Sequence, residues 1–197
     1  MYASLAADYP NHLPLLMAKL KYLDSLDNRT DKLDEIVSIA KAVLDKISEP
    51  DLALHFGRKV DTDDPAANKE RKEMKDRKSI FIEALARLAL AYGALPDSGE
   101  QFTETLTRLK CWVDVDEKHP QVAILREERA GRWGLVLKIV NKLLSKELKE
   151  KEYVLPISKP ALFDKRVEAL SAMKYEALVE HDKMSRVISC PPTYAAF

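Results

Sequence analysis

The sequence contains little glycine: five of its 197 residues. The glycines do not form the loops G-x-G-x-x-G or G-x-x-x-x-G-K-[ST] that cradle phosphates, and no G-x-S-x-G turn presents a serine nucleophile. All-β sandwiches and barrels need frequent glycine turns, so these folds are excluded as well. The scarcity of glycine therefore favours a helical protein without a familiar catalytic loop.

The chain also has no excess of charge of either sign. It carries 32 Lys and Arg against 32 Asp and Glu, so its formal net charge is zero and no overall field attracts nucleic acid or an anionic membrane. The longest apolar stretch, 80–95, is interrupted by Glu83 and Arg87 and is shorter than the roughly 20 residues of a membrane span. The sequence predicts neither nucleic acid nor a membrane as a partner.

Cysteine is rare too. Cys111 and Cys190 form no C-x-x-C pair and no disulfide framework, which is typical of proteins in a reducing compartment. The first ten residues show no basic region followed by an apolar run, and so no secretory signal. We therefore expect a cytoplasmic location.

Apolar residues recur at helical spacing through most of the chain. Asp64-Pro65 is a strong helix start, a cap followed by proline, and the turn at 96–99 ends that long helix. Ser98 and Gln101 then have the spacing of a capping box. About nine helices are predicted, with apolar positions within 13–23, 33–47, 52–56, 65–95, 102–113, 122–125, 133–144, 163–170 and 175–187.

These helices predict an all-α fold. Short connections favour antiparallel neighbours, stacked in pairs as an α-solenoid or packed as an irregular bundle. The turn Gly131-Arg132-Trp133 between two helices is similar to one in a tetratricopeptide unit. We expect one helical domain over 1–197, with sub-units 1–60, 61–118 and 119–197 as a finer division.

A search for chemistry identifies no reactive constellation. The four histidines are His12, His55, His119 and His181. They form neither the zinc motif H-E-x-x-H nor any pair spaced four residues apart on a helix. The acidic run at 61–64 resembles the start of a calcium loop but lacks the glycine at its sixth position and the glutamate at its twelfth. Ser48, Ser98 and Ser158 precede helices and are interpreted as caps. No catalytic, cofactor-binding or metal-binding residue is predicted.

The run 69–78 mixes six basic residues with three carboxylates. Three oppositely charged pairs lie four residues apart, Lys69–Glu73, Lys72–Asp76 and Glu73–Arg77. Such pairs stabilise an exposed helix by roughly 0.2–0.5 kcal/mol each. We interpret the run as a solvated helix face rather than a nucleic-acid surface.

Three stretches resemble the C-terminal end of the tripeptidyl peptidase II family. The first is YPNHLPLLMAKLKYLD at 9–24, similar to YP-x-x-LPL-x-x-A-x-L-x-x-LD, and the second is LDEIVSIAKAVLDKI at 33–47. The third is PPTYAAF at 191–197, similar to an ending PP-x-Y-x-x-F. The turn GRWGL at 131–135 resembles a GRGL-type turn with Trp133 in place of glycine. Since the first and third stretches lie near the two ends, the resemblance covers the whole chain.

This resemblance implies a parent enzyme that is a cytosolic subtilisin-like serine exopeptidase. Such an enzyme removes tripeptides from free N-termini of oligopeptides and assembles into a giant homo-oligomeric spindle. Its Asp, His and Ser triad belongs to an N-terminal domain that binds the peptide substrates, and no G-T-S-x-A motif occurs here. The resemblance therefore implies a non-catalytic helical domain without cofactors, whose partners are other protomers, and a length that describes a segment of a longer protein.

We expect the interface residues on the long helix and at the terminus: Met74, Phe81, Tyr92, Tyr194 and Phe197. For the terminal segment 190–197, the alternative to a partner contact is an intramolecular clamp on the last helices. One alternative is an independent helical-repeat adaptor that binds a partner peptide in its groove. Another is a stand-alone enzyme with a helical active site, which predicts turnover by the isolated chain.

Overall fold

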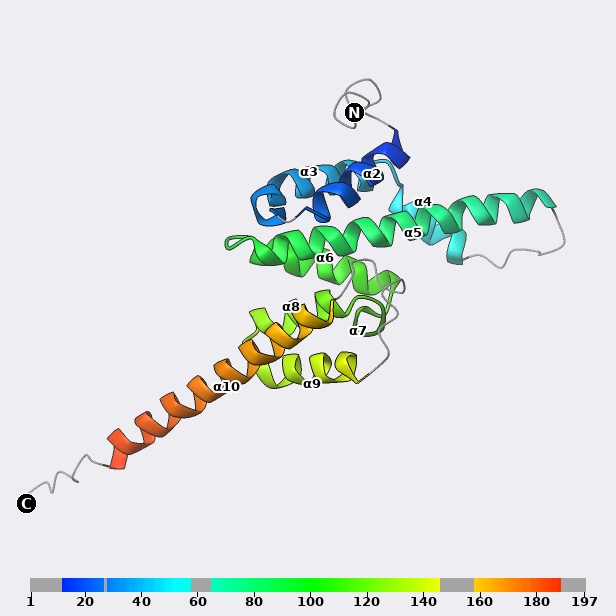
Figure 1. Ribbon diagram of the computed structural model, residues 1–197. Helices are drawn as coiled ribbons and strands as arrows, with labels where there is room; N and C mark the ends of the chain where they lie inside the picture. The colour runs from blue at the N-terminus through cyan, green and yellow to red at the C-terminus, as the bar shows by residue number, and fades with distance from the viewer. Residues whose placement is uncertain (1–11, 27, 58–64, 146–157, 189–197) are drawn as a thin grey trace, which may run out of the picture. The chain divides into compact units, whose positions relative to one another are not determined.

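The computed structural model describes residues 12–26, 28–57, 65–145 and 158–188, and within these ranges it is all-α (Figure 1). The helices there are α2 (Leu13–Asp24), the 3-10 helix η1 (Arg29–Lys32), α3 (Leu33–Leu44), α4 (Glu49–Gly57), α5 (Pro65–Ala94), α6 (Gly99–Trp112), α7 (Val115–Lys118), α8 (Pro120–Arg129), α9 (Trp133–Leu144) and α10 (Lys159–Ile188). The predicted fold class and the expectation of about nine helices are confirmed.

The chain divides into two compact units, 1–122 and 123–197, where the sequence predicts one domain. Helix α3 packs along α5, and both belong to the first unit. The apolar faces of α2 and α3 are covered by α5, so residues on either side of 60 share one core. We describe each unit by itself.

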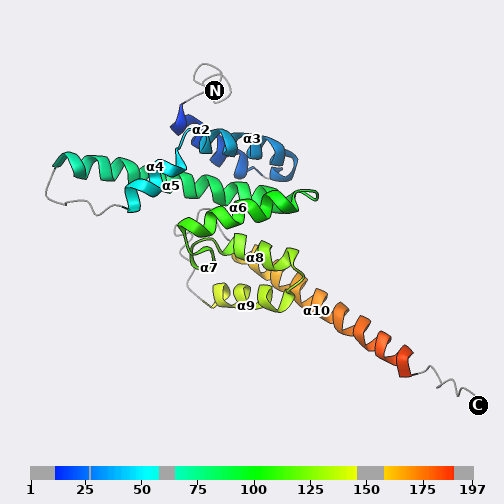
Figure 2. The same ribbon diagram turned by 180° about the vertical axis from the view of Figure 1, so that it is seen from behind.

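Helix α5 is the central element of the first unit. Helices α2 and α3 lie on one side of it and α6 lies on the other, as both views show (Figures 1 and 2). Residues 84–93 are all buried, since helices cover this half of α5 on two sides. Four alanines in this stretch let the neighbouring helices approach closely: Ala84, Ala86, Ala89 and Ala91. The arrangement is an irregular bundle around one buried helix.

Ser98 is the N-cap residue of α6 and its carbonyl accepts from the Phe102 amide at 2.9 Å, but its side chain is used at the end of α5. Its hydroxyl donates to the carbonyl oxygens of Tyr92 at 2.6 Å and Leu95 at 3.0 Å, and it makes no side-chain cap bond to α6. The predicted capping box with Gln101 is therefore wrong, while the turn between the helices is confirmed. The last carbonyls of a helix lack partners within it, so the buried Ser98 hydroxyl, whose single hydrogen is shared between these two oxygens, is directed to the end of α5 rather than to an amide of α6.

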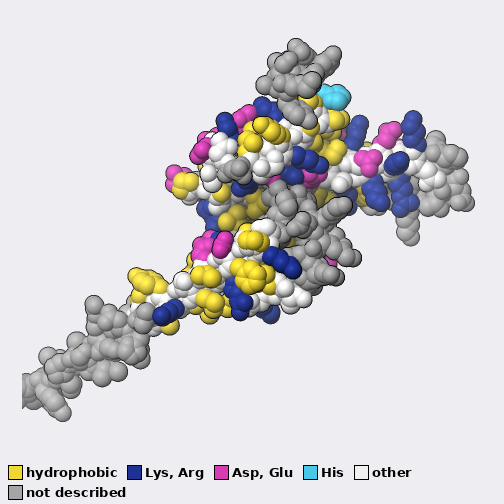
Figure 3. All heavy atoms as spheres, viewed as in Figure 1, with side chains coloured by type: hydrophobic (Ala, Val, Ile, Leu, Met, Phe, Trp, Pro, Cys, Tyr) yellow, Lys and Arg dark blue, Asp and Glu magenta, His cyan; other side chains and the backbone are white. Residues whose placement is uncertain are grey.

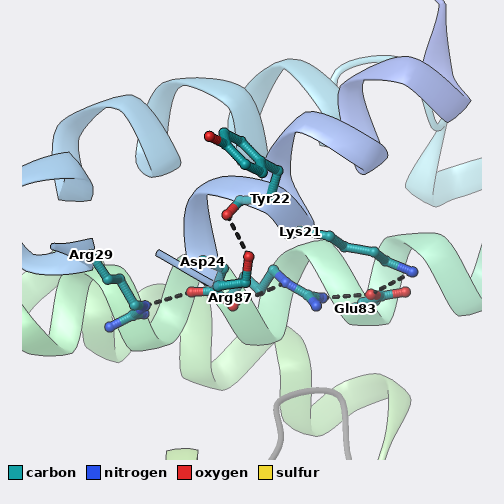
Figure 4. Close-up of polar contacts among 7 residues, drawn as sticks. Lys21, Tyr22, Asp24, Arg29, Glu83 and Arg87 are labelled. Carbon is teal, nitrogen blue, oxygen red and sulfur yellow. Dashed lines mark hydrogen bonds and ion pairs between the residues drawn. The ribbon is translucent and has the colours of Figure 1, made fainter. Parts of the chain in front are cut away.

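A network of charged side chains, with Asp24 and Arg87 buried at its centre, lies where α2 meets α5 (Figure 4). An Asp24 carboxylate oxygen lies 3.2 Å from Arg87 Nε, and Arg87 Nη1 donates to Glu83 Oε1 at 2.6 Å. Arg29 Nε donates to the other oxygen of Asp24, and Lys21 Nζ lies 3.0 Å from Glu83 Oε1. Buried charges are costly unless paired, and each charge here has an opposite neighbour. The network joins α2, η1 and α5.

The second unit is built from the end of α8, α9 and α10. Its buried core consists of Ile124, Val136, Val140, Leu143, Leu162 and Ala169. The turn from α8 to α9 contains Gly131 with φ +68°. The amides of Gly131 and Arg132 donate to the carbonyls of Glu128 and Glu127, both at 2.9 Å, which is the Schellman pattern of a helix end. The left-handed conformation of Gly131 is therefore required by the turn.

Helix α10 runs unbroken where the sequence predicts two helices, at 163–170 and 175–187. No glycine or proline lies between these two ranges, so nothing stops the first helix at residue 170. The helix buries Leu162 and Ala169 against its unit, whereas Phe163, Val167 and Leu170, the apolar positions of the first predicted range, are exposed. Because α10 has two apolar faces, the sequence pattern alone does not indicate which one α9 covers.

Candidate functional site

Glu49 ties the start of α4 to the end of α6. Its two carboxylate oxygens accept hydrogen bonds of 2.8 Å from Trp112 Nε1 and from Arg108 Nη2. Glu49 lies in the first turn of α4, where a negative charge is favoured by the unpaired amides of the helix terminus. These contacts cross about sixty residues of sequence and fix the position of α4 on the first unit.

Aromatic rings and cations meet at the same junction. Lys78 Nζ lies 4.4 Å from the centre of the Phe56 ring and 5.4 Å from that of the Trp112 ring. The Trp112 ring meets Phe81 edge to face, with ring centres 5.6 Å apart. Cations over aromatic faces and edge-to-face rings are both stabilising geometries. The Lys78 ammonium is thereby held over one face of the exposed Phe56 ring.

Two grooves adjoin this junction and share Phe56 and Lys78. One, of about 640 Å³, is lined mainly by α4 and α6, and we call it the aromatic groove: Glu49, Pro50, Ala53, Phe56, Lys78, Cys111 and Trp112. The other, of about 670 Å³, is lined mainly by the first half of α5, and we call it the basic groove: Phe56, Asn68, Arg71, Lys72, Lys75, Lys78, Ser79 and Ile82. The basic groove has four cations and no carboxylate in its lining.

Four of the six cations on the first half of α5 lie on one side of the helix. Arg71, Lys72, Lys75 and Lys78 follow spacings of one, three and three residues, which places them along one side of a helix. Lys and Arg side chains gather on this part of the surface (Figure 3). The three carboxylates of the segment do not line the groove: Glu70, Glu73 and Asp76.

The described residues form none of the three ion pairs whose spacing the sequence offers, Lys69–Glu73, Lys72–Asp76 and Glu73–Arg77. The interpretation of the run as a solvated helix face agrees with its exposure, since only Met74 and Lys78 of residues 69–78 are half-buried. The sequence signal that could have identified the basic groove is the helical spacing of its cations at positions 71, 72, 75 and 78.

The residues expected at an interface lie in different surroundings. Phe81 is fully buried and Tyr92 is buried as well, so both pack inside the first unit rather than at its surface. Met74 is half-buried on the first half of α5. Tyr194 and Phe197 lie outside the described residues.

His119 is buried beneath the charged network of α5. Burial and the nearby positive charge of Arg87 lower the pKa of His119 to about 4, partly opposed by Glu83. Its imidazole is therefore neutral at physiological pH. Among the residues that the structure describes, no three or more His, Cys, Asp or Glu side chains are grouped to hold a metal ion.

The second unit presents an apolar surface on α10. Phe163, Val167 and Leu170 are 52%, 63% and 47% exposed, and their spacing of four and three residues aligns them over two turns. Hydrophobic side chains are visible on this unit in Figure 3. We call these three residues the α10 stripe.

No helix of the described part of the chain combines the length and apolar composition needed to cross a membrane. No protein-family model and no solved structure matches the chain.

Two curated proteins are similar to the chain. Tripeptidyl-peptidase 2 of Oryza sativa subsp. japonica is 26% identical over 211 aligned residues, which cover 100% of this chain. Tripeptidyl-peptidase 2 of Arabidopsis thaliana is 26% identical over 211 residues, which cover 98% of this chain. The chain spans 15% of the length of each relative. Over its whole length it is therefore similar to a segment of tripeptidyl-peptidase 2, and the resemblance indicated by its three sequence stretches is confirmed.

Proposed function

We propose that the chain is a non-catalytic C-terminal helical segment of a tripeptidyl-peptidase 2-like enzyme of the cytoplasm, and that it supports assembly of identical protomers. The parent activity would be the release of tripeptides from the N-termini of oligopeptides by a serine protease domain elsewhere in the protein. Similarity over the whole chain to 15% of two tripeptidyl-peptidases supports this placement.

The α10 stripe is the observation that carries the assembly role. Three large apolar side chains are about half exposed or more on one face of a helix. Covering them by a second protomer would contribute about 1 kcal/mol each, roughly half the value for a fully buried side chain. Contiguous apolar surface of this kind is typical of protein interaction sites.

The length of α10 supports the same role. It has 30 residues, whereas its neighbour α9 has 12. At 1.5 Å per residue these helices are about 45 Å and 18 Å long, so α9 covers only part of α10. A second copy of the same helix is an occupant of matching length and apolar character.

Sedimentation velocity of the purified chain over a range of concentrations tests the assembly role. We expect the wild type to self-associate and Val167→Glu to raise the dissociation constant about tenfold or more, because it places a charge in the stripe. Tyr175→Glu is the matched control, since Tyr175 is a similarly exposed apolar residue of α10 outside the α10 stripe. A monomeric wild type, or equal effects of the two substitutions, would contradict the proposal.

The non-catalytic role has its own test. The isolated chain is incubated with an oligopeptide that has a free N-terminus, and the products are identified by mass spectrometry. We expect no tripeptide release. Release that persists after removal of trace proteases would show that the chain itself is an enzyme.

A further inference from the structure

The basic groove holds positive charge that the described chain does not neutralise. Arg71, Lys72 and Lys75 are exposed, Lys78 is half-buried, and no carboxylate among the described residues forms an ion pair with any of the four. Four like charges on two turns of one helix repel one another. An anionic ligand in the groove would relieve this repulsion.

The groove has an apolar part as well. Phe56 and Ile82 both line the groove. Phe56 is 39% exposed, and Ile82, four residues after Lys78 on α5, is half-buried. Asn68 and Ser79 add polar side chains to the lining. A ligand that fits this lining carries negative charges along one side and an apolar group that can rest against Phe56.

The dimensions match a short peptide. From residue 71 to residue 78 the helix rises about 10 Å. An extended peptide covers this distance in about three to four residues, and its alternate side chains point to the same face. Two carboxylates on one face of such a peptide are therefore spaced to reach cations on successive turns of α5.

We infer that the basic groove binds an acidic peptide segment, whose carboxylates pair with Arg71, Lys72 and Lys75 while an apolar side chain packs on Phe56 and Ile82. Nucleic acid fits this site less well, because Lys78 already lies 4.4 Å from the centre of the Phe56 ring and covers a face on which a base would stack. This inference concerns the first unit and does not depend on the proposed assembly role.

Fluorescence anisotropy with the intact chain tests the inference. The probe is a labelled pentapeptide with four glutamates around a central phenylalanine, and the comparison peptide has glutamine in place of every glutamate. We expect saturable binding of the acidic peptide that weakens as salt is raised, and binding of the glutamine peptide weaker by about tenfold or more. No saturable binding, or equal binding of both peptides, would overturn the inference.

A charge-reversal pair locates the site. Lys72→Glu with Lys75→Glu places two negative charges in the groove, whereas Lys69→Glu with Arg77→Glu makes the same change in net charge on exposed residues outside its lining. We expect the dissociation constant to rise about tenfold or more for the first pair and less than about threefold for the second. An equal rise in the dissociation constant for the two double variants would place peptide binding outside the groove and overturn the inference.

Two further measurements address the apolar wall and the class of ligand. Phe56→Ala is expected to weaken binding of the phenylalanine-containing peptide severalfold. Binding of a peptide with glycine in place of its phenylalanine is expected to be unchanged. A labelled oligothymidylate of six nucleotides is expected to bind more weakly than the acidic peptide. Tighter binding of the oligonucleotide than of the acidic peptide would overturn the assignment of the groove to a peptide ligand. Circular dichroism is used to check that each variant is folded.

Discussion

Asp24 and Arg87 form a buried ion pair, in which Asp24 Oδ2 lies 3.2 Å from Arg87 Nε. Solvent is almost excluded from both side chains. Their side chains are 1% and 5% exposed. Asp24 ends α2 and Arg87 lies in the buried half of α5, so the pair connects helices that are far apart in sequence. It specifies how α2 lies on α5 in a way that apolar contacts alone do not.

Removing one partner of this pair is expected to be destabilising. Asp24→Asn removes the carboxylate that faces Arg87 from α2 and leaves Glu83 as its acidic partner, and a buried charge that loses one partner in this way costs about 1–3 kcal/mol of unfolding free energy. Urea denaturation followed by circular dichroism gives the value. Glu35→Gln is the control, because the Lys19–Glu35 pair is 2.9 Å long with side chains 30% and 40% exposed. Its cost is expected to stay below about 1 kcal/mol, and equal costs for the two variants would contradict the buried role of Asp24.

His119 is expected to make the fold less stable in mild acid. Its pKa is about 4 when folded and near 6.5 when unfolded, so between these values the unfolded chain binds more protons and stability falls as pH falls. The unfolding free energy falls by about 3 kcal/mol in total, and this fall is complete near pH 4. Unfolding free energies measured from pH 7 to pH 4 for the wild type and for His119→Gln give the two slopes. A slope as steep in the variant as in the wild type would show that other groups cause the loss.

Two glycines at the α8–α9 corner are expected to respond oppositely to alanine. Gly131 has φ +68°, so Gly131→Ala forces a side chain into the left-handed region at a cost of about 1 kcal/mol. Gly134 lies within α9, and a methyl group there meets nothing within 4 Å. Gly134→Ala is therefore expected to stabilise by roughly 0.5–1 kcal/mol, because alanine is the better helix former. Thermal denaturation of both variants gives the signs, and the same sign for both would refute the assignment of the turn.

Local rules account for most of the helices. Helical periodicity predicted the first seven of the expected segments, and the two cap serines Ser48 and Ser158 each accept an amide hydrogen bond at their helix starts. These features depend on residues close in sequence, which is why the pattern predicts them. The pattern predicted a break within α10 that does not exist, because periodicity measures where apolar residues lie and not whether the backbone stops.

Candidate sites were harder to predict than helices. The basic groove needs Phe56 of α4 beside the cations of α5, and no local pattern brings these helices together. Glu49 binds Arg108 and Trp112 across about sixty residues, and the sequence shows no relation between them. The interface expectation for Phe81 and Tyr92 rested on their helical stripe, but α5 is covered on two sides, which buries that stripe.

The sequence by itself determined that the chain is helical, that it carries no familiar catalytic loop, and that it resembles tripeptidyl peptidase II, because composition, periodicity and motif are properties of residues in order. Only the tertiary structure decided which apolar face each helix buries, because that depends on the helix that covers it. It buried Leu162 and Ala169 and exposed the α10 stripe, and it gathered the cations of α5 beside Phe56. The proposed assembly surface and the proposed peptide groove both follow from these choices.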